Sequence, residues 1–310
     1  MGNFIGHSDI INSFKKRAIN KSLSHAHLIV GVDGIGKSKL ARIFALQVVD
    51  GVDTRQYVDI IDYSPKKASF GVDEIRELIS EVNKKPFEGN KKVIIIHEGN
   101  KLTIQAQNAL LKTIEEPPSG VFIIMLCESL ELVLDTIKSR CQIYKLTPLS
   151  KDEIYEYIES IKGDATEAQI LASLAYSEGI PGRAERLLTD NSLNNLRELL
   201  LDVLSDANNG SSDILLKHEN LLLAYKDNKD EILNILTSFI RDIMIYKELN
   251  DTNLIINSDK IDSLKKLAIG MSYKKLNKVL DKIKEARINL LSNSNFAITI
   301  RVMVIGFMEG

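Results

Sequence analysis

The chain has 310 residues, of which 44% are hydrophobic and 26% are charged, so it can fill the cores of two or three domains of an ordinary globular protein. Its formal net charge of -2 excludes a global basic field that would attract nucleic acid, although a local basic patch stays open. The two cysteines form no Cys-x-x-Cys pair, and no apolar run reaches the ~18 residues of a membrane span. We therefore expect a cytoplasmic protein.

The first half of the chain, to about residue 148, alternates apolar runs with segments of helical periodicity. Strands are expected at 27–30, 58–63, 93–96, 121–126 and 142–146, and helices at 39–49, 72–82 and 105–116. The β-branched run at 93–96 is typical of a strand that is covered on both faces. Such alternation predicts a parallel sheet with helices on both sides, so we expect an α/β domain at 1–148.

The second half shows helical periodicity alone. Ser150 and Glu153 have the spacing of a capping box, which predicts that a helix begins there. Further helices are expected at 166–176, 181–189, 213–226, 229–248, 259–269, 272–292 and 295–308. The segment 208–212, Asn-Asn-Gly-Ser-Ser, is the best linker candidate. The pattern therefore predicts a small helical domain at 149–207 and a larger all-α domain at 208–310.

A phosphate-binding motif follows the first predicted strand. Residues 31–38 read Gly-Val-Asp-Gly-Ile-Gly-Lys-Ser, in which glycines let several backbone N–H groups face one anion at the start of a helix. In this motif Lys37 reaches the β- and γ-phosphates and Ser38 ligates Mg²⁺. The other expected binding residues within this loop are Gly31, Asp33, Gly34, Ile35 and Gly36. A glycine turn with an incidental lysine is the alternative, but the position between a strand and a helix favours ATP or ADP, with or without Mg²⁺.

The strand at 93–96 ends in His97 and Glu98. In a nucleotide hydrolase with this loop, the corresponding strand normally ends Asp-Glu, where Asp helps to hold Mg²⁺ and Glu orients the attacking water. His97 is a poor substitute, because Mg²⁺ prefers oxygen and imidazole suits transition metals better. A purely local hydrogen bond of His97 stays open beside a metal role. Since the carboxylate is missing in either case, we expect Glu98 to lie at a site where hydrolysis is very weak.

Two further motifs carry a family resemblance. Residues 105–118 read Gln-Ala-Gln-Asn-Ala-Leu-Leu-Lys-Thr-Ile-Glu-Glu-Pro-Pro, and residues 136–142 read Thr-Ile-Lys-Ser-Arg-Cys-Gln. Together with the phosphate loop, they closely resemble the AAA+ clamp-loader subunits of DNA replication. The similarity covers about residues 4–190. It implies an AAA+ phosphate-loop domain, a helical lid at 149–207 and a helical collar at 208–310 through which subunits assemble.

Within this family the chain resembles the delta-prime branch of bacterial DNA polymerase III. The resemblance implies gamma/tau and delta subunits as partners, and contact with the sliding clamp and primer-template DNA through the complex. It also implies a rigid scaffold that supplies an arginine finger to a neighbouring ATPase. Arg140, in Ser-Arg-Cys, matches that finger, whose guanidinium stabilises charge at the neighbour's γ-phosphate. The alternative for Arg140 is a surface arginine in an intramolecular ion pair.

Other family positions differ in strength. Arg183 matches the start of the helix that carries the second nucleotide sensor, so the resemblance implies that it contacts a bound nucleotide from the lid, as Glu98 does from the sheet. An exposed arginine in a first helical turn is the alternative. The first sensor is altered, because 125–128 read Met-Leu-Cys-Glu where Thr or Asn often follows the strand. Residues 50–70 contain no cysteine, so the resemblance predicts no zinc module.

The main rival is an active ATPase, either a gamma/tau-type motor or another AAA+ protein. The intact Lys37 and Ser38 favour this interpretation, whereas His97, the altered first sensor and the missing zinc cysteines count against it. The printed sequence also lacks the long C-terminal extension of tau-type subunits. A polymerase active subunit is a third class, but the sequence does not supply the metal-binding carboxylates that nucleotidyl transfer requires.

Overall fold

A computed structural model describes residues 4–52, 55–65, 70–211, 213–292 and 294–308. The chain divides into two compact units, one of residues 1–160 with 179–182 and one of residues 161–178 with 183–310. The predicted boundaries at 148 and 207 stay a prediction, and the last residue of the linker candidate at 208–212 lies outside the described residues. Among the described residues, no helix combines the length and the apolar character needed to cross a membrane.

The first unit contains a parallel five-stranded sheet. Its strands are β1 (Ala26–Val30), β2 (Ile60–Tyr63), β3 (Lys92–Ile96), β4 (Val121–Cys127) and β5 (Gln142–Lys145). Their order across the sheet is β2-β3-β4-β1-β5, so β1 lies between β4 and β5. Because parallel neighbours need crossover connections, the helices between the strands cover both faces. The predicted fold class, an α/β parallel-sheet domain followed by helices, is confirmed.

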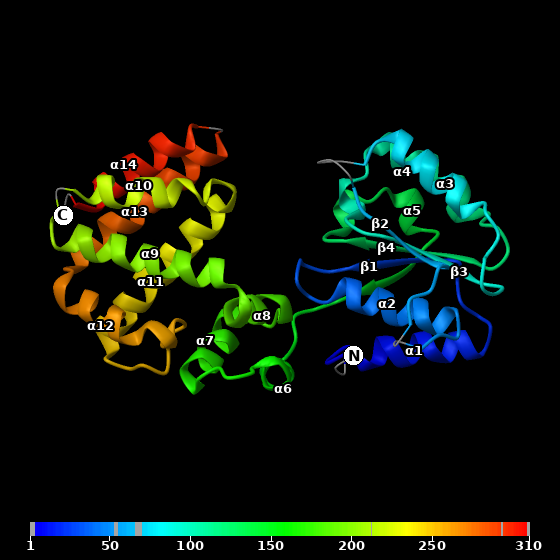
Figure 1. Ribbon diagram of the computed structural model, residues 1–310, viewed down its shortest axis with the longest axis horizontal. Coiled ribbons are helices and arrows are strands. Elements are labelled where there is room, and N and C mark those ends of the chain that lie inside the picture. Colours follow the sequence, from blue (N-terminus) through cyan, green and yellow to red (C-terminus); the bar gives the residue numbers. More distant parts are fainter. Residues whose placement is uncertain (1–3, 53–54, 66–69, 212, 293, 309–310) are drawn as a thin grey trace. The chain divides into compact units, whose positions relative to one another are not determined.

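Helices of the first unit cover both faces of this sheet, with α1 (Ser8–Ile19) and α2 (Lys37–Val48) on one face and α3 (Val72–Val82), α4 (Ile104–Glu115) and α5 (Asp135–Lys138) on the other (Figure 1). Helix α6 (Lys151–Ile161) follows β5. Successive side chains of β3 point to opposite faces, as a strand requires. Ile94 and Ile96 pack with α3 and α4, whereas Val93 and Ile95 pack with α1 and α2. The continuous apolar run of β3 therefore serves two separate cores.

The predicted capping box of α6 is confirmed. The backbone N–H of Ser150 donates to the carboxylate of Glu153 at 2.8 Å, and the backbone N–H of Glu153 donates to the Ser150 hydroxyl at 3.3 Å. Two helices of this unit were not predicted. In α1 only Phe14 is fully buried, so its periodicity is weak, and α5 spans a single turn.

The second unit is helical and has one continuous apolar core. Its helices are α7 (Glu167–Ser177), α8 (Pro181–Thr189, whose first two residues belong to the first unit), α9 (Asn191–Asn208), α10 (Ile214–Leu223), α11 (Lys229–Leu249), α12 (Ile261–Gly270), α13 (Tyr273–Leu291) and α14 (Phe296–Met308), with short 3₁₀ turns η3 (Lys226–Asn228) and η4 (Ser258–Lys260). Helix α9 packs against α10, α11, α12 and α14, and α13 packs against α11 and α14. Burial of apolar side chains from these helices drives the packing.

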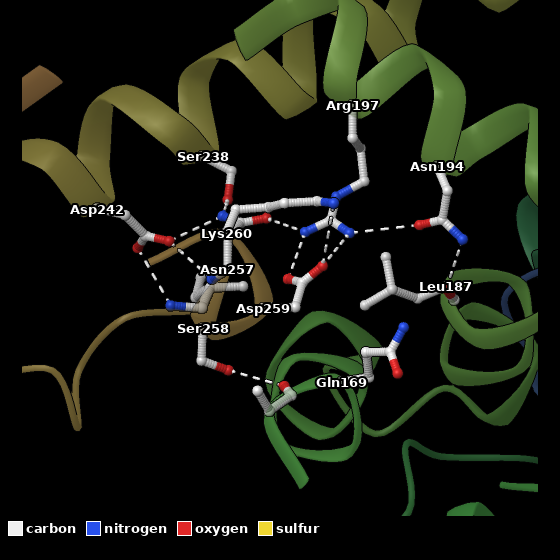
Figure 2. Close-up of polar contacts among 12 residues, drawn as sticks. Gln169, Leu187, Asn194, Arg197, Ser238, Asp242, Asn257, Ser258, Asp259 and Lys260 are labelled. Atoms are coloured by element: carbon white, nitrogen blue, oxygen red, sulfur yellow. Dashed lines mark hydrogen bonds and ion pairs between the residues drawn. The ribbon is translucent and has the colours of Figure 1, made fainter. Parts of the chain in front are cut away.

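A buried polar network fixes the loop before α12 to this core (Figure 2). Arg197 of α9 is 1% exposed and donates two hydrogen bonds to Asp259, at 2.8 and 2.7 Å, and one to Asn257 at 3.0 Å. Asn257 in turn donates to Asp242 of α11 at 2.8 Å. The hydroxyl of Ser258 donates to a backbone carbonyl of α7 at 3.1 Å. Thus α7, which belongs to the predicted lid, packs with the C-terminal helices.

Candidate nucleotide-binding site and arginine turn

The phosphate loop lies where the sequence predicts it, between β1 and α2. Gly34 has φ 79° and Gly36 has φ 104°, in the left-handed region that favours glycine. The backbone N–H of Gly31 donates to the carbonyl of Cys127 at 3.1 Å, which fixes the loop to β4. Ile35 is 2% exposed and anchors the loop in the core below it. The first backbone N–H groups of α2 have no partner within the helix, so the loop can present them to an anion.

The side chain of Lys37 folds back onto its own loop. Its ammonium donates to the carbonyl oxygens of Gly31 at 2.8 Å and Val32 at 2.9 Å. Burial lowers the pKa of Lys37, while the nearby carboxylates of Asp33 and Glu128 act in the opposite direction. The Lys37 ammonium is therefore held against the backbone of its own loop.

Ser38, in the first turn of α2, faces the histidine that replaces the metal-binding Asp. The Ser38 hydroxyl oxygen lies 3.4 Å from Nδ1 of His97. On the other side of the ring, Nε2 lies 2.7 Å from a carboxylate oxygen of Asp62 in β2. This arrangement is possible because β2 and β3 are parallel neighbours, so their carboxyl ends meet at one edge of the sheet. The Asp62 carboxylate thus lies near the loop, but it contacts His97 and not Ser38 directly.

A segment that follows the predicted first lid helices covers the loop. The backbone N–H of Gly182 donates to the carbonyl of Gly34 at 2.9 Å. A Cβ placed on Gly182 would lie 2.8 Å from the Gly34 Cα, so the two backbones touch and a larger residue would separate them. The side chain of Ile180 is 4% exposed and packs into the same core as Ile35. The 179–182 segment is therefore part of the loop's immediate surroundings.

Glu98 does not join this cluster through any contact that the structure shows. It has φ 50° and its carboxylate pairs with Lys101 at 2.9 Å. In the altered first sensor, Cys127 is fully buried, and burial raises the pKa of its thiol to about 12. Among the residues that the structure describes, no group of three or more His, Cys, Asp or Glu side chains could hold a metal ion.

Arg140 lies exposed in the turn between α5 and β5. Its guanidinium pairs with the carboxylate of Glu115 at 2.5 Å and donates to the carbonyl of Thr136 at 2.9 Å. Glu115 belongs to the Glu-Glu-Pro-Pro end of α4, so the fold brings the two family motifs together. About 40% of the Arg140 side chain and 43% of the Glu115 side chain stay exposed, which leaves the pair accessible to another molecule.

A buried glutamine holds the polypeptide that leads to this turn. The side-chain amide of Gln107 in α4 donates to the carbonyl oxygens of Leu102 at 3.2 Å and Leu132 at 3.0 Å. Its amide oxygen accepts the backbone N–H of Leu134 at 2.8 Å. Because Leu134 directly precedes α5, these bonds fix the start of the short helix that presents Arg140.

Arg183 is exposed at the start of α8 and forms an ion pair with Glu178. It thus has the local partner expected of an ordinary surface arginine, and its sensor role stays a prediction.

Sequence reasoning missed three residues that shape these sites, namely Asp62, Gly182 and Glu115. Asp62 becomes visible only when β2 is placed beside β3. Gly182 directly precedes Arg183 in the sequence, but its contact with Gly34 depends on tertiary structure. Glu115 was part of the quoted family motif, and the expected alternative of an intramolecular ion pair for Arg140 pointed towards such a partner.

Two protein-family models match this chain. A model described as DNA polymerase III, delta subunit, matches residues 6–150, and one described as DNA polymerase III, delta subunit, C terminal, matches residues 191–303. Together the two ranges cover most of the chain. The chain belongs to this family of clamp-loader subunits. The resemblance to delta-prime-type subunits of DNA polymerase III is thereby confirmed, as is the predicted role in DNA replication at the level of the family.

Individual relatives match different shares of the chain. DNA polymerase III subunit delta' of Bacillus subtilis is 24% identical over 305 residues, which cover 93% of this chain and 92% of that protein. Subunit tau/gamma of Haemophilus influenzae is 27% identical over 249 residues, which cover 69% of this chain but only 36% of that protein. A gamma subunit-related protein of Thermotoga maritima has the same fold, with a TM-score of 0.55, 17% identity, and coverage of 96% of this chain and 98% of that structure.

Proposed function

We propose that the chain is a delta-prime-type scaffold subunit of a clamp loader, which supplies Arg140 to the ATP site of a neighbouring subunit. The observation that carries this proposal is the exposed Arg140, held on a fixed turn by Gln107 and α5. A finger that acts on a neighbour's ATP needs an accessible guanidinium. It does not need a working ATP site in its own chain. The replacement of the metal-binding Asp by His97 fits this division of labour.

Glu115 gives Arg140 a defined position before assembly. In the free subunit the carboxylate partly neutralises the guanidinium and limits the conformations that it samples. A neighbour's γ-phosphate carries more negative charge than one carboxylate, so it can compete for the same donors. An exposed ion pair contributes at most ~1 kcal/mol, and breaking it on assembly is therefore inexpensive.

The phosphate loop binds ATP or ADP in this proposal and hydrolyses it weakly. Gly31, Asp33, Gly34, Ile35 and Gly36 form the curled backbone, and the ammonium of Lys37 meets the phosphates. The hydroxyl of Ser38 and the ring of His97, 3.4 Å apart, would face a cation bound with the nucleotide, and that ion would neutralise phosphate charge. Glu98 and Arg183 complete the nucleotide contacts that the family resemblance implies.

Assembly uses the C-terminal helices, which act as a collar in this proposal. On α14, Ile298, Val302 and Ile305 recur at helical spacing and are 62%, 53% and 39% exposed. Exposed apolar residues on one helix face are typical of an interface. The partners are gamma/tau and delta subunits, and the sliding clamp and primer-template DNA are reached through the complex. We place this complex in the cytoplasm.

A second candidate function is an active gamma/tau-type motor. The presence of both Lys37 and Ser38 supports it, because these are the residues of such a loop that contact phosphate and cation. The motor and the scaffold differ in one property, namely turnover of ATP by the chain on its own.

The arginine finger is tested in the reconstituted loader. Arg140→Ala should leave assembly intact and reduce the ATPase rate of the complex by ~10³-fold, since such fingers contribute 10³–10⁵ in rate. Arg76→Ala is the matched control, because Arg76 is an exposed arginine of α3 with a carboxylate partner, Asp73, at 3.0 Å. If the Arg140→Ala complex assembles and hydrolyses ATP at the control rate, Arg140 is not the finger.

A further inference from the structure

The histidine at the end of β3 is held between two side chains from other elements. Nε2 of His97 lies 2.7 Å from the Asp62 carboxylate, and Nδ1 lies 3.4 Å from the Ser38 hydroxyl. The His97 side chain is 23% exposed, whereas the Asp62 side chain is 55% exposed. Asp62 therefore lies on the solvent side of the ring, and Nδ1 faces the phosphate loop.

The carboxylate decides which ring nitrogen is available. An ionised carboxylate can only accept a hydrogen bond, so Nε2 carries the proton in the contact with Asp62. In the neutral ring, Nδ1 of His97 then keeps its lone pair and directs it towards Ser38. Histidines that ligate metals commonly donate the other ring N–H to a carboxylate, which fixes the tautomer and increases the basicity of the ligand. Asp62 and His97 have this arrangement.

The spacing of the two donors favours a particular coordination geometry. Two ligands at ~2.0–2.2 Å from a tetrahedral cation are ~3.4 Å apart, whereas adjacent ligands of octahedral Mg²⁺ at ~2.0–2.1 Å are ~2.9 Å apart. Ser38 Oγ and His97 Nδ1 are separated by 3.4 Å. The nature of the donors points the same way, because imidazole suits borderline transition-metal ions better than Mg²⁺.

We propose that this nucleotide site selects a borderline divalent cation, of the Co²⁺ and Zn²⁺ kind, over Mg²⁺. Ser38 and His97 are its protein ligands, the nucleotide phosphates and water complete the coordination, and Asp62 positions the ring. Among the described residues, no group of three or more His, Cys, Asp or Glu side chains could hold an ion. The cation therefore needs ligands from the nucleotide and enters together with it. This inference rests on the proposed nucleotide site and gives a reason for keeping Ser38 beside a histidine.

The test measures ADP affinity of the full chain, free of any histidine tag, in EDTA, in Mg²⁺ and in Co²⁺. Co²⁺ should tighten ADP binding at least tenfold more than Mg²⁺ does, and the bound Co²⁺ should show the intense visible absorption of a four-coordinate ion. His97→Asp should reverse the preference towards Mg²⁺. Asp62→Asn should weaken the Co²⁺ effect by ~10–100-fold, the usual result of losing such a carboxylate partner.

A second histidine–carboxylate pair in the chain provides the control. His218 Nε2 lies 2.8 Å from Asp206 in the helical unit, so Asp206→Asn removes a similar contact and should leave the Co²⁺ effect unchanged. Nucleotide binding that Mg²⁺ and Co²⁺ strengthen equally, or a Co²⁺ effect that survives in His97→Gln, overturns the inference but leaves the nucleotide site standing. Absence of ADP binding under every condition contradicts the site and the inference together.

Discussion

Replacing Arg197 by methionine tests whether the buried network holds the helical unit together. Arg197 is 1% exposed and the Asp259 side chain is 10% exposed, so methionine would leave a carboxylate in a nearly dry environment. It would also remove a donor from Asn257, at 3.0 Å in the native structure. Breaking a buried pair by removing one partner typically costs ~3–5 kcal/mol. We expect Arg197→Met to lower the free energy of unfolding of this unit by that amount.

Urea denaturation followed by far-UV circular dichroism measures the loss, because the chain contains no tryptophan for fluorescence. Because the chain has two compact units, the comparison uses the transition assigned to the helical unit. Arg301→Met, which removes an exposed ion pair with Glu219, should leave the midpoint of that transition unchanged. The double variant Arg197→Met/Asp259→Leu should recover much of the loss, since an apolar pair replaces the ionic one. A loss below ~1 kcal/mol in Arg197→Met would refute the reasoning.

Three further predictions concern the α/β unit. Burial lowers the pKa of His27 to about 4, so the unfolded chain binds a proton below pH ~6.5 that the folded chain excludes, and stability should fall by ~3 kcal/mol from pH 6.5 to 4. His27→Phe should flatten this dependence of the urea midpoint, and an equally steep profile in the variant would contradict it. Burial raises the pKa of Cys127 and Cys141 to about 12, so both thiols should react slowly with a disulfide reagent at pH 8 until urea is added; fast labelling of the native chain would disagree. Gly182→Ala should weaken ADP binding by separating the 179–182 segment from Gly34, and unchanged affinity would show that this contact does not shape the loop.

Local patterns were sufficient to predict most of the α/β unit. The β-branched run of β3 predicts a covered strand, and the Gly-x-x-x-x-Gly-Lys-Ser motif predicts a turn between a strand and a helix. Both patterns are local and do not depend on distant residues. Helix α9 was missed for a physical reason: its first turns contain Asn191, Asn194 and Asn195, residues that are typical of turns. Asp190 overcomes this preference, because its carboxylate accepts the backbone N–H groups of Ser192 and Leu193.

The polar contacts of the candidate sites depend on sheet order and helix packing, which a single sequence does not reveal. Asp62 and His97 are 35 positions apart and meet only because β2 pairs with β3. Glu115 and Arg140 lie in two motifs that the family resemblance singles out, but their ion pair depends on how α4 packs beside the turn after α5. The sequence therefore predicts which residue types are unusual, and the structure shows what each one contacts.

Turnover of ATP by the purified chain, measured first alone and then after addition of partner subunits, tests the central claim most directly. We expect the isolated chain to bind nucleotide but to hydrolyse it far below ~1 s⁻¹, the lower end of the usual enzyme range. Hydrolysis should appear only in the complex and should depend on Arg140. Turnover at ~1 s⁻¹ or faster by the isolated chain, which Lys37→Ala abolishes, would contradict the scaffold and establish the motor instead.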